Sequence, residues 1–221
     1  MEEKLQPNIS YDTETIKLEK AYKYFILKRC IDILGALIGI IILSPIMLIT
    51  IIAIRLNSKG AVIFAQERVG LNEKMFKMYK FRSMVNNAEE LKEDLMTDNE
   101  MTGPMFKIKE DPRVTSVGRF IRKTSIDELP QLFNILKGDM SLVGPRPNLP
   151  REVKIFSLYH RQKLLAKPGL TCYWQVMGRS TIGFEEWMEL DIKYIRERNT
   201  WIDIKLILKT FFVLFGDKNA A

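Results

Sequence analysis

Two adjacent acidic residues are the strongest candidates for chemistry in this sequence. Asp127 and Glu128 stand in the segment 125–130 (SIDELP), where a helical pattern is expected. A carboxylate in the first turn of a helix has its ionised form stabilised, so Asp127 would be an anion able to bind a divalent metal ion or attack an electrophile. A structural interpretation stays open, because Ser-x-x-Glu is also the capping-box pattern, in which Ser125 and Glu128 satisfy backbone N–H groups.

Basic residues flank this acidic pair on both sides. If Asp127 is to meet a phosphate, both groups are anions, so Mg²⁺ and forked guanidinium groups are needed to bring them together. The upstream cations are Arg113, Arg119, Arg122 and Lys123. Downstream, Arg146 lies among the prolines of the segment 138–150, which restrict the backbone and leave little entropy to lose on binding an anion. A generic proline-rich turn is the alternative interpretation.

Two further segments carry polar groups that suit an anionic ligand. Lys80 and Arg82 alternate with apolar neighbours, which places both on one face of an expected strand. The segment 167–179 contains Gln175 and Arg179 beside a Tyr-Trp pair. It could shape a pocket for a nucleotide or a lipid headgroup, or equally form a core turn with a surface arginine.

The composition limits the class of protein and its partners. At 221 residues, with 47% apolar and 28% charged residues, the chain is long enough for one domain and is not disordered. Cys30 and Cys172 lie far apart without a Cys-x-x-Cys motif, so neither a disulfide framework nor a zinc site is expected. The single histidine, His160, is expected at the surface, which leaves no basis for a Ser-His-Asp triad. The net charge of +7 favours nucleic acid, anionic lipid or phosphorylated substrates as partners.

An uncharged stretch at residues 33–54 has the length of a membrane segment. At its midpoint, Pro45 cannot donate to the carbonyl of Ile41, so we expect a kink there, with the Ser44 hydroxyl satisfying the freed carbonyl. Basic residues flank both ends, whereas a spanning helix shows a bias toward one side. Two interpretations stay open: a re-entrant hairpin broken at Ser44 and Pro45, with both ends on one face, or a single span with a tolerated proline.

The rest of the chain predicts a mixed α/β fold that is mostly α. Residues 56–82 are expected to form two short strands joined by a turn. Helical spacing of apolar residues follows at residues 120–136 and again at 184–197. The last helix, at residues 201–215, carries an aromatic-rich stripe that suits either the headgroup layer of a membrane or ordinary core packing.

Taken together, these residues resemble the bacterial sugar transferases, the monotopic polyprenol-phosphate phosphoglycosyl transferases. The resemblance runs from about Lys28 to Thr210 and rests on motifs whose order, rather than any one of them, is specific. The motifs are Lys28-Arg29-x-x-Asp32, Ser44-Pro45, Lys80-Phe81-Arg82-Ser83-Met84, Asp127-Glu128-Leu129-Pro130-Gln131, Gly138-Asp139-Met140-Ser141, Gly144-Pro145-Arg146-Pro147, Lys167-Pro168-Gly169 and Trp174-Gln175-Val176-x-Gly178-Arg179.

The resemblance implies an activity and a location. Members of this kind move a sugar-1-phosphate from a UDP-sugar to undecaprenyl phosphate, release UMP and so start a surface polysaccharide. It implies a re-entrant hairpin whose ends both lie at the cytoplasmic face of the inner membrane, membrane lipids as partners, and no nucleic-acid partner. The segments 103–106 and 178–180 are closer to members that handle hexose-1-phosphates such as galactose or glucose. Whether the protein acts as a monomer or a homodimer is left open.

The resemblance also assigns roles and boundaries. Asp127 would be the nucleophile that forms a covalent phosphosugar intermediate, and Glu128 would assist metal binding or accept a proton, with both carboxylates at a required Mg²⁺. The candidate substrate and phosphate contacts are Lys80, Arg82, Arg122, Arg146, Gln175 and Arg179. The implied parts are a polar lead (1–27), the re-entrant membrane hairpin (28–58) and a compact cytosolic transferase domain with short strands and interfacial amphipathic helices (59–221).

Two alternatives from other classes remain at this stage. A non-enzymatic, membrane-anchored basic protein could bind nucleic acid or anionic lipid, and Asp127 and Glu128 would then serve only as caps. A metal-dependent hydrolase of lipid diphosphates would release free phosphate instead of UMP.

Overall fold

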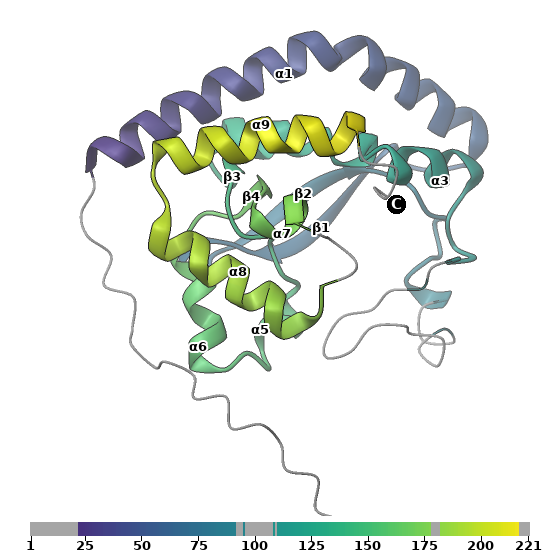
Figure 1. Ribbon diagram of the computed structural model, residues 1–221. Helices are drawn as coiled ribbons and strands as arrows, with labels where there is room; N and C mark the ends of the chain where they lie inside the picture. Colours follow the sequence, from purple (N-terminus) through teal and green to yellow (C-terminus); the bar gives the residue numbers. More distant parts are fainter. Residues whose placement is uncertain (1–21, 92–94, 96–107, 109, 178–181, 217–221) are drawn as a thin grey trace, which may run out of the picture.

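The computed structural model describes residues 22–91, 95, 108, 110–177 and 182–216. Helices dominate this part of the chain, as the mixed and mostly α prediction requires (Figure 1). The elements are α1 (Tyr22–Asn57), β1 (Ile63–Val69), η1 (Leu71–Glu73), β2 (Met75–Phe81), α3 (Ser116–Lys123), η3 (Ile126–Glu128), α4 (Gln131–Lys137), β3 (Ser141–Val143), α5 (Pro150–Val153), α6 (Leu158–Arg161), η4 (Gln162–Leu165), β4 (Gly169–Thr171), α7 (Tyr173–Met177), α8 (Phe184–Glu197) and α9 (Thr200–Gly216).

The apolar segment forms one continuous helix, α1, in place of the predicted helix, break and second helix. Pro45 lies inside this helix, which arches over the rest of the domain (Figure 1). The Ser44 Oγ donates a hydrogen bond of 2.8 Å to the carbonyl of Ile41, the group that Pro45 cannot reach. This contact confirms the expected role of Ser44, and it explains how the helix passes the proline without an interruption.

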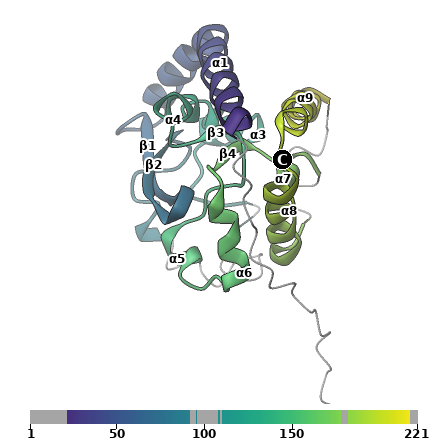
Figure 2. The same cartoon turned by 90° about the vertical axis from the view of Figure 1, so that its left-hand side faces the viewer.

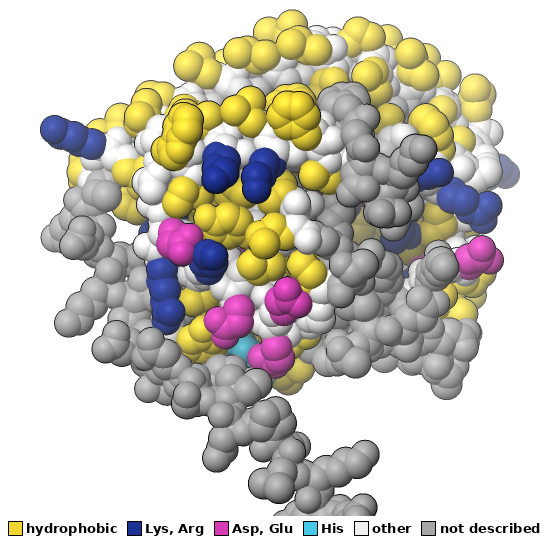
Figure 3. Space-filling view, in the orientation of Figure 1, with side chains coloured by type: hydrophobic (Ala, Val, Ile, Leu, Met, Phe, Trp, Pro, Cys, Tyr) yellow, Lys and Arg dark blue, Asp and Glu magenta, His cyan; other side chains and the backbone are white. Residues whose placement is uncertain are grey.

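The two faces of α1 differ sharply. Small residues on the inner face allow close packing, because a Cβ at Gly35 would meet Leu142 at 2.6 Å and one at Gly39 would meet Leu132 at 3.3 Å. The outer face exposes large apolar side chains, among them Ile41 at 71%. In the described part of the chain, α1 is the one helix long and apolar enough to cross a membrane. Figure 3 shows apolar side chains, in yellow, gathered at the top of the molecule, where α1 lies in Figure 1.

The predicted hairpin is confirmed, and a second pair of strands was not foreseen. β1 and β2 pair antiparallel around η1, where Asn72 takes a left-handed conformation with a φ of 52°. β3 and β4 pair in parallel, with Ser141 opposite Gly169. This pairing brings the backbone of Gly144 against that of Gly169, so closely that a Cβ on either glycine would clash. The Gly-Pro-Arg-Pro and Lys-Pro-Gly segments therefore lie side by side.

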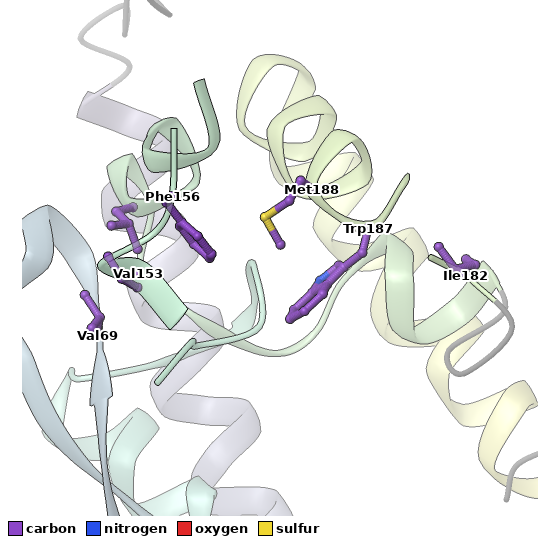
Figure 4. Close-up of a cluster of buried hydrophobic side chains, with 7 residues drawn as sticks. Val69, Val153, Phe156, Ile182, Trp187 and Met188 are labelled. Carbon is purple, nitrogen blue, oxygen red and sulfur yellow. The ribbon is translucent and has the colours of Figure 1, made fainter. Parts of the chain in front are cut away.

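The core links the hairpin to the C-terminal helices. Seven buried side chains form one of its clusters (Figure 4): Val69, Val153, Phe156, Leu164, Ile182, Trp187 and Met188. Figure 2 shows β1 and β2 on one side of the domain, α8 on the other, and β3 and β4 between them. His160, expected at the surface, is buried and lies 3.1 Å from Glu185.

The aromatic stripe of the last helix does not pack in the core. In α9, Trp201 and Phe212 are 72% and 77% exposed, so the core-packing interpretation of this stripe is wrong. The helix instead buries the acidic Asp203, whose carboxylate accepts hydrogen bonds from the Tyr194 hydroxyl at 2.7 Å and from Lys28 at 2.9 Å. One face of α9 is thus tied to the domain while Trp201, Phe211 and Phe212 remain on the surface.

Candidate functional site

The acidic pair lies in a short 3₁₀ turn, not in the first turn of a helix. Residues 120–136 were expected to form one helix, but α3 ends at Lys123, the turn η3 carries Asp127 and Glu128, and α4 begins only at Gln131. Ser125, just before η3, takes a left-handed conformation with a φ of 56° and makes no side-chain cap. The capping-box interpretation is therefore wrong. Left-handed conformations of non-glycine residues are strained and concentrate at functional sites.

Apolar neighbours anchor this turn. Ile126 and Leu129, which flank the acidic pair, pack against a cluster made of Ile54, Phe81 and Ile121. The cluster therefore joins the turn to α1, β2 and α3. Because these anchors stand on either side of the pair, packing fixes the turn without using the carboxylates.

The environment of Asp127 differs from the expectation of an anion stabilised by a helix. The residue is only 7% exposed. Burial raises the pKa of Asp127 above its usual range, and the charge of Glu128 raises it further, whereas Lys80, Arg122 and Arg146 oppose the shift. Burial outweighs the cations, so the carboxylate is poorly solvated when ionised. A poorly solvated carboxylate is more reactive than one exposed to water.

Two of the predicted cations meet the acidic pair. The Lys80 Nζ lies 2.8 Å from the Glu128 Oε1 and 3.7 Å from the Asp127 Oδ2. Arg146 reaches the same Glu128 oxygen with its Nη1 at 3.7 Å, and its guanidinium lies over the Trp174 ring, 5.4 Å from the centroid. Residues that are far apart in the sequence thus surround Asp127 and Glu128 with positive charge.

Asn134, which sequence analysis missed, fixes Lys80 relative to the turn. Its side chain is fully buried, accepts a hydrogen bond from the backbone N–H of Tyr79 at 2.9 Å and donates one to the carbonyl of Lys77 at 2.7 Å. These bonds lock α4 onto β2 next to Lys80. A buried amide between apolar neighbours in a helical pattern is the only sequence signal, and it does not reveal its partners.

A buried network holds the segment that carries Arg146. Asn148 donates to Glu152 at 2.9 Å and accepts from Lys163 at 2.6 Å, and Lys163 forms a 2.7 Å ion pair with Asp191. The carbonyl of Asn148 also accepts from the backbone N–H of Val69 at 3.0 Å. The rigidity expected from the prolines is thus reinforced by side chains that sequence analysis did not identify.

The remaining predicted contacts fall in different places. Arg82 is buried, and its hydrogen bonds reach Ser58 and Asn86 near the end of α1, away from the acidic pair. Arg122 is exposed on α3, and its charge acts on Asp127. Gln175, on α7, is buried and lines a narrow pocket beside Glu128 and Arg146. Arg179 and the segment 103–106 lie outside the described residues.

The Lys-Arg-x-x-Asp motif connects α1 to the domain that carries the site. Arg29 donates to the carbonyls of Ile135 and Leu136 at the end of α4, at 2.6 and 2.8 Å. Asp32 accepts from the Ser141 hydroxyl at 2.9 Å and from the backbone N–H of Leu142 at 2.8 Å. The motif therefore holds the apolar helix against α4, the helix that follows the acidic turn.

The donor set suits a magnesium ion shared with a substrate. The described residues contain no group of three or more acidic, histidine or cysteine side chains that could hold a metal by themselves. Mg²⁺ is usually bound by one or two carboxylates together with phosphate oxygens and water. Asp127 and Glu128 supply such a pair, so the site fits Mg²⁺ when a phosphorylated ligand completes the coordination.

The structure thus combines a buried Asp127, a half-buried Glu128, two cations that meet them and a helix of membrane length. The sequence matches the family described as bacterial sugar transferase over residues 23–217, and the chain belongs to that family.

Individual relatives agree with this assignment. The chain is 47% identical over 216 residues to the galactosyl transferase CpsE of Streptococcus agalactiae, and the matched region covers 96% of this chain and 48% of the relative. It is 44% identical over 188 residues to the undecaprenyl-phosphate galactose phosphotransferase of Salmonella typhimurium, and this match covers 83% of this chain and 39% of the relative. Against these two relatives, the chain spans half their length or less. The exopolysaccharide production protein ExoY of Sinorhizobium fredii is 35% identical, with 83% of each chain covered.

Proposed function

We propose that this protein transfers a sugar-1-phosphate from a UDP-sugar to undecaprenyl phosphate, releases UMP and thereby starts the synthesis of a surface polysaccharide. The observation that carries the proposal is Asp127, buried on a strained turn with Lys80 at 3.7 Å and next to Glu128, which Arg146 reaches. Two relatives support the substrate class and a hexose: the undecaprenyl-phosphate galactose phosphotransferase of Salmonella typhimurium and the undecaprenyl-phosphate glucose phosphotransferase of Komagataeibacter xylinus, which is 38% identical over 204 residues.

The proposed chemistry proceeds in two displacements at phosphorus. An Asp127 carboxylate oxygen attacks the β-phosphorus of the UDP-sugar, and the bond to the bridging oxygen breaks, so that UMP leaves with the electron pair. A phosphate oxygen of the lipid then attacks the same phosphorus and frees the Asp127 carboxylate. Phosphoryl transfer depends mainly on positioning and charge stabilisation, which Lys80 and Arg146 supply here.

Asp127 and Glu128 would hold Mg²⁺ together with the diphosphate. When bound, the ion would neutralise charge on the phosphate oxygens and make the approach of a carboxylate less unfavourable. Glu128 already has Lys80 at 2.8 Å, so this residue orients the lysine whether or not it also contacts the metal.

The apolar surface supports a position at the cytoplasmic face of the inner membrane. The outer face of α1 and the aromatic residues of α9 are exposed together at one end of the molecule (Figures 1 and 3). A bent helix with cations at both ends fits a re-entrant path in which both ends stay in the cytosol. The UDP-sugar would then arrive from the cytosol and the lipid phosphate from the headgroup layer.

The location can be tested by labelling single cysteines. Lys20→Cys and Lys59→Cys would be made one at a time in a chain whose own Cys30 and Cys172 are replaced, and intact cells would be probed before and after permeabilisation. A re-entrant helix predicts that both positions react only after permeabilisation. Labelling of one position from outside would show that the helix spans the membrane.

The activity can be tested with the detergent-extracted full chain. Incubation with Mg²⁺, undecaprenyl phosphate and a panel of UDP-sugars should release UMP with at least one donor. Donor without acceptor should leave a phosphosugar adduct on Asp127, detected by mass spectrometry of the peptide containing residues 124–137. Absence of UMP release with every donor would favour a non-enzymatic anionic-lipid-binding protein, and release of free phosphate would indicate a hydrolase.

A further inference from the structure

Arg68 is a largely buried cation that the proposed chemistry does not use. It is the second-last residue of β1 and lines the narrow pocket beside the acidic turn. The other lining residues of this pocket are Met78, Glu128, Gln131, Arg146, Pro147, Gly169, Leu170 and Gln175. Its neighbours in the sequence gave no reason to select it.

The guanidinium of Arg68 is held in place but is not neutralised. Its Nη1 donates to the carbonyl of Pro147 at 3.0 Å and its Nη2 to the Gln66 Oε1 at 2.6 Å. Its Nε is buried and has no hydrogen-bond partner among the described residues. Within those residues, no carboxylate forms an ion pair with Arg68. A fixed, buried guanidinium with spare donor capacity is suited to an anion supplied from outside.

A second guanidinium faces the same pocket. Burial and the nearby charge of Arg146 lower the pKa of Arg68 to about 10, while Glu152 and Glu128 act in the opposite direction. The two positively charged guanidinium groups line the same pocket and repel each other. An anion bound between them would remove this repulsion.

We propose that Arg68, together with Arg146, binds the phosphate of the departing nucleotide in the pocket beside Glu128. This inference rests on the proposed function. Displacement at phosphorus places the attacking and leaving oxygens in line, so the leaving phosphate must lie beyond the β-phosphorus as seen from Asp127. The amides of Gln131 and Gln175, which line the same pocket, can complete the hydrogen bonding of a phosphate.

The lining of the pocket favours the nucleotide over the lipid as the source of this phosphate. Its residues come from β1, β2, the acidic turn, the start of α4, the Gly-Pro-Arg-Pro segment, β4 and α7. None of its described residues belongs to α1 or α9, whose exposed apolar faces are where a polyprenyl chain would lie. A phosphate attached to such a chain would approach from that end of the molecule.

The test is calorimetric titration of the detergent-extracted full chain with UMP, which does not require turnover. We expect Arg68→Met to weaken UMP binding by about tenfold or more, the loss typical of a charge-assisted hydrogen bond. Arg68→Lys keeps the charge but not the fork, so it should fall between this variant and the wild type. Arg151→Met is the matched control, because Arg151 is exposed on α5 and contributes to the same electric field without lining the pocket.

Three results would overturn the proposal. Arg68→Met could bind UMP as the wild type does, or Arg151→Met could lose as much affinity, which would show a long-range field only. Arg68→Met could also raise the KM for undecaprenyl phosphate at unchanged UMP affinity, which would assign the pocket to the lipid. A thermal melt of each variant checks folding, and if Arg68→Met does not fold, Arg68→Lys decides alone.

The outcome is separable from that of the proposed function. UMP binding that depends on Arg68, in a protein that transfers no sugar-phosphate from any donor, would reject the transferase and retain the pocket. Sugar-phosphate transfer with UMP binding that is indifferent to Arg68 would reject the pocket and retain the transferase.

Discussion

Among the described lysines that meet buried carboxylates, Lys163 and Lys80 do so in arrangements that differ in almost every respect. Lys163 and Asp191 are 1% and 0% exposed, form one ion pair of 2.7 Å, and are enclosed by Asn148 and the Trp187 ring. Lys80 is 18% exposed and contacts two carboxylates, Glu128 at 2.8 Å and Asp127 at 3.7 Å. These carboxylates belong to a turn that borders a pocket. The first arrangement is fully enclosed, whereas the second borders a pocket that Glu128 lines.

The difference separates an enclosed ion pair from an acidic turn that a ligand can approach. In the closed pair, burial lowers the pKa of Lys163 and raises that of Asp191, and the ion pair opposes both shifts. At the acidic turn, Lys80 is shared between two acids, and burial raises the pKa of Asp127 as it raises that of Asp191. The two regions differ in access, because Glu128 lines a pocket and the closed pair does not.

Replacing Asp127 by Asn is expected to have the largest effect on activity. The amide has no charge with which to attack phosphorus, so UMP release should fall by roughly four orders of magnitude. Because the folded-state pKa of Asp127 lies above its unfolded value, ionisation costs stability at pH values above that raised pKa. The variant should therefore melt no lower than the wild type at neutral pH, and this advantage should vanish as the pH falls below about 3.9. Loss of folding instead would make the turn a structural element.

The same substitution at Asp191 should have the opposite consequence. Asp191→Asn leaves Lys163 buried without its counter-ion, which should lower the free energy of unfolding by about 3–5 kcal/mol. Chemical denaturation of the detergent-extracted chain measures this loss. Activity per folded molecule should fall far less than in Asp127→Asn. If both Asn variants lost activity equally without loss of stability, the distinction between the two regions would be wrong.

Arg146 connects the two regions, because it reaches Glu128 and is carried by the segment that Asn148 and Lys163 hold. Arg146→Ala should reduce UMP release by roughly 100-fold, since a phosphate would lose a charge-assisted contact. Arg151→Ala, on the exposed surface of α5, is the control and should retain most of the activity. Activity of Arg146→Ala close to that of the control would remove Arg146 from the site.

The pH dependence should show the smallest effect. The raised pKa of Asp127 predicts that activity declines on acidification at a higher pH than an exposed aspartate would give. Lys80 is the strongest influence that lowers this pKa, so Lys80→Met should move the acid limb of the residual activity upward by about one unit. The double variant Lys163→Met/Asp191→Leu is the control, because it removes a different buried lysine together with its counter-ion. The acid limb of its pH profile should not move. An unmoved limb in Lys80→Met would show that another group controls it.

Local patterns in the sequence predicted several elements well. The hairpin, α8, α9 and the Ser44 contact to Ile41 follow from alternation, helical spacing and the missing N–H of proline, all of which act over a few residues. The structure also brings Asp127, Glu128, Lys80 and Arg146 together, and their roles in catalysis and binding stay predictions. The expectation for Arg82 was less useful, because its hydrogen bonds hold the end of α1.

The sequence by itself determined the two C-terminal helices, the segment that is apolar enough for a membrane, and the charged residues that are candidates for phosphate chemistry. Only the tertiary structure decided that Asp127 is buried on a strained turn and that β3 lies beside β4. It also placed Arg68 in the pocket beside Glu128, and it buried Asn134 and the Lys163–Asp191 pair. The reason is that helical and strand periodicity depend on neighbours a few residues away, whereas burial, ion pairing and pKa shifts depend on groups that folding brings together from distant parts of the chain.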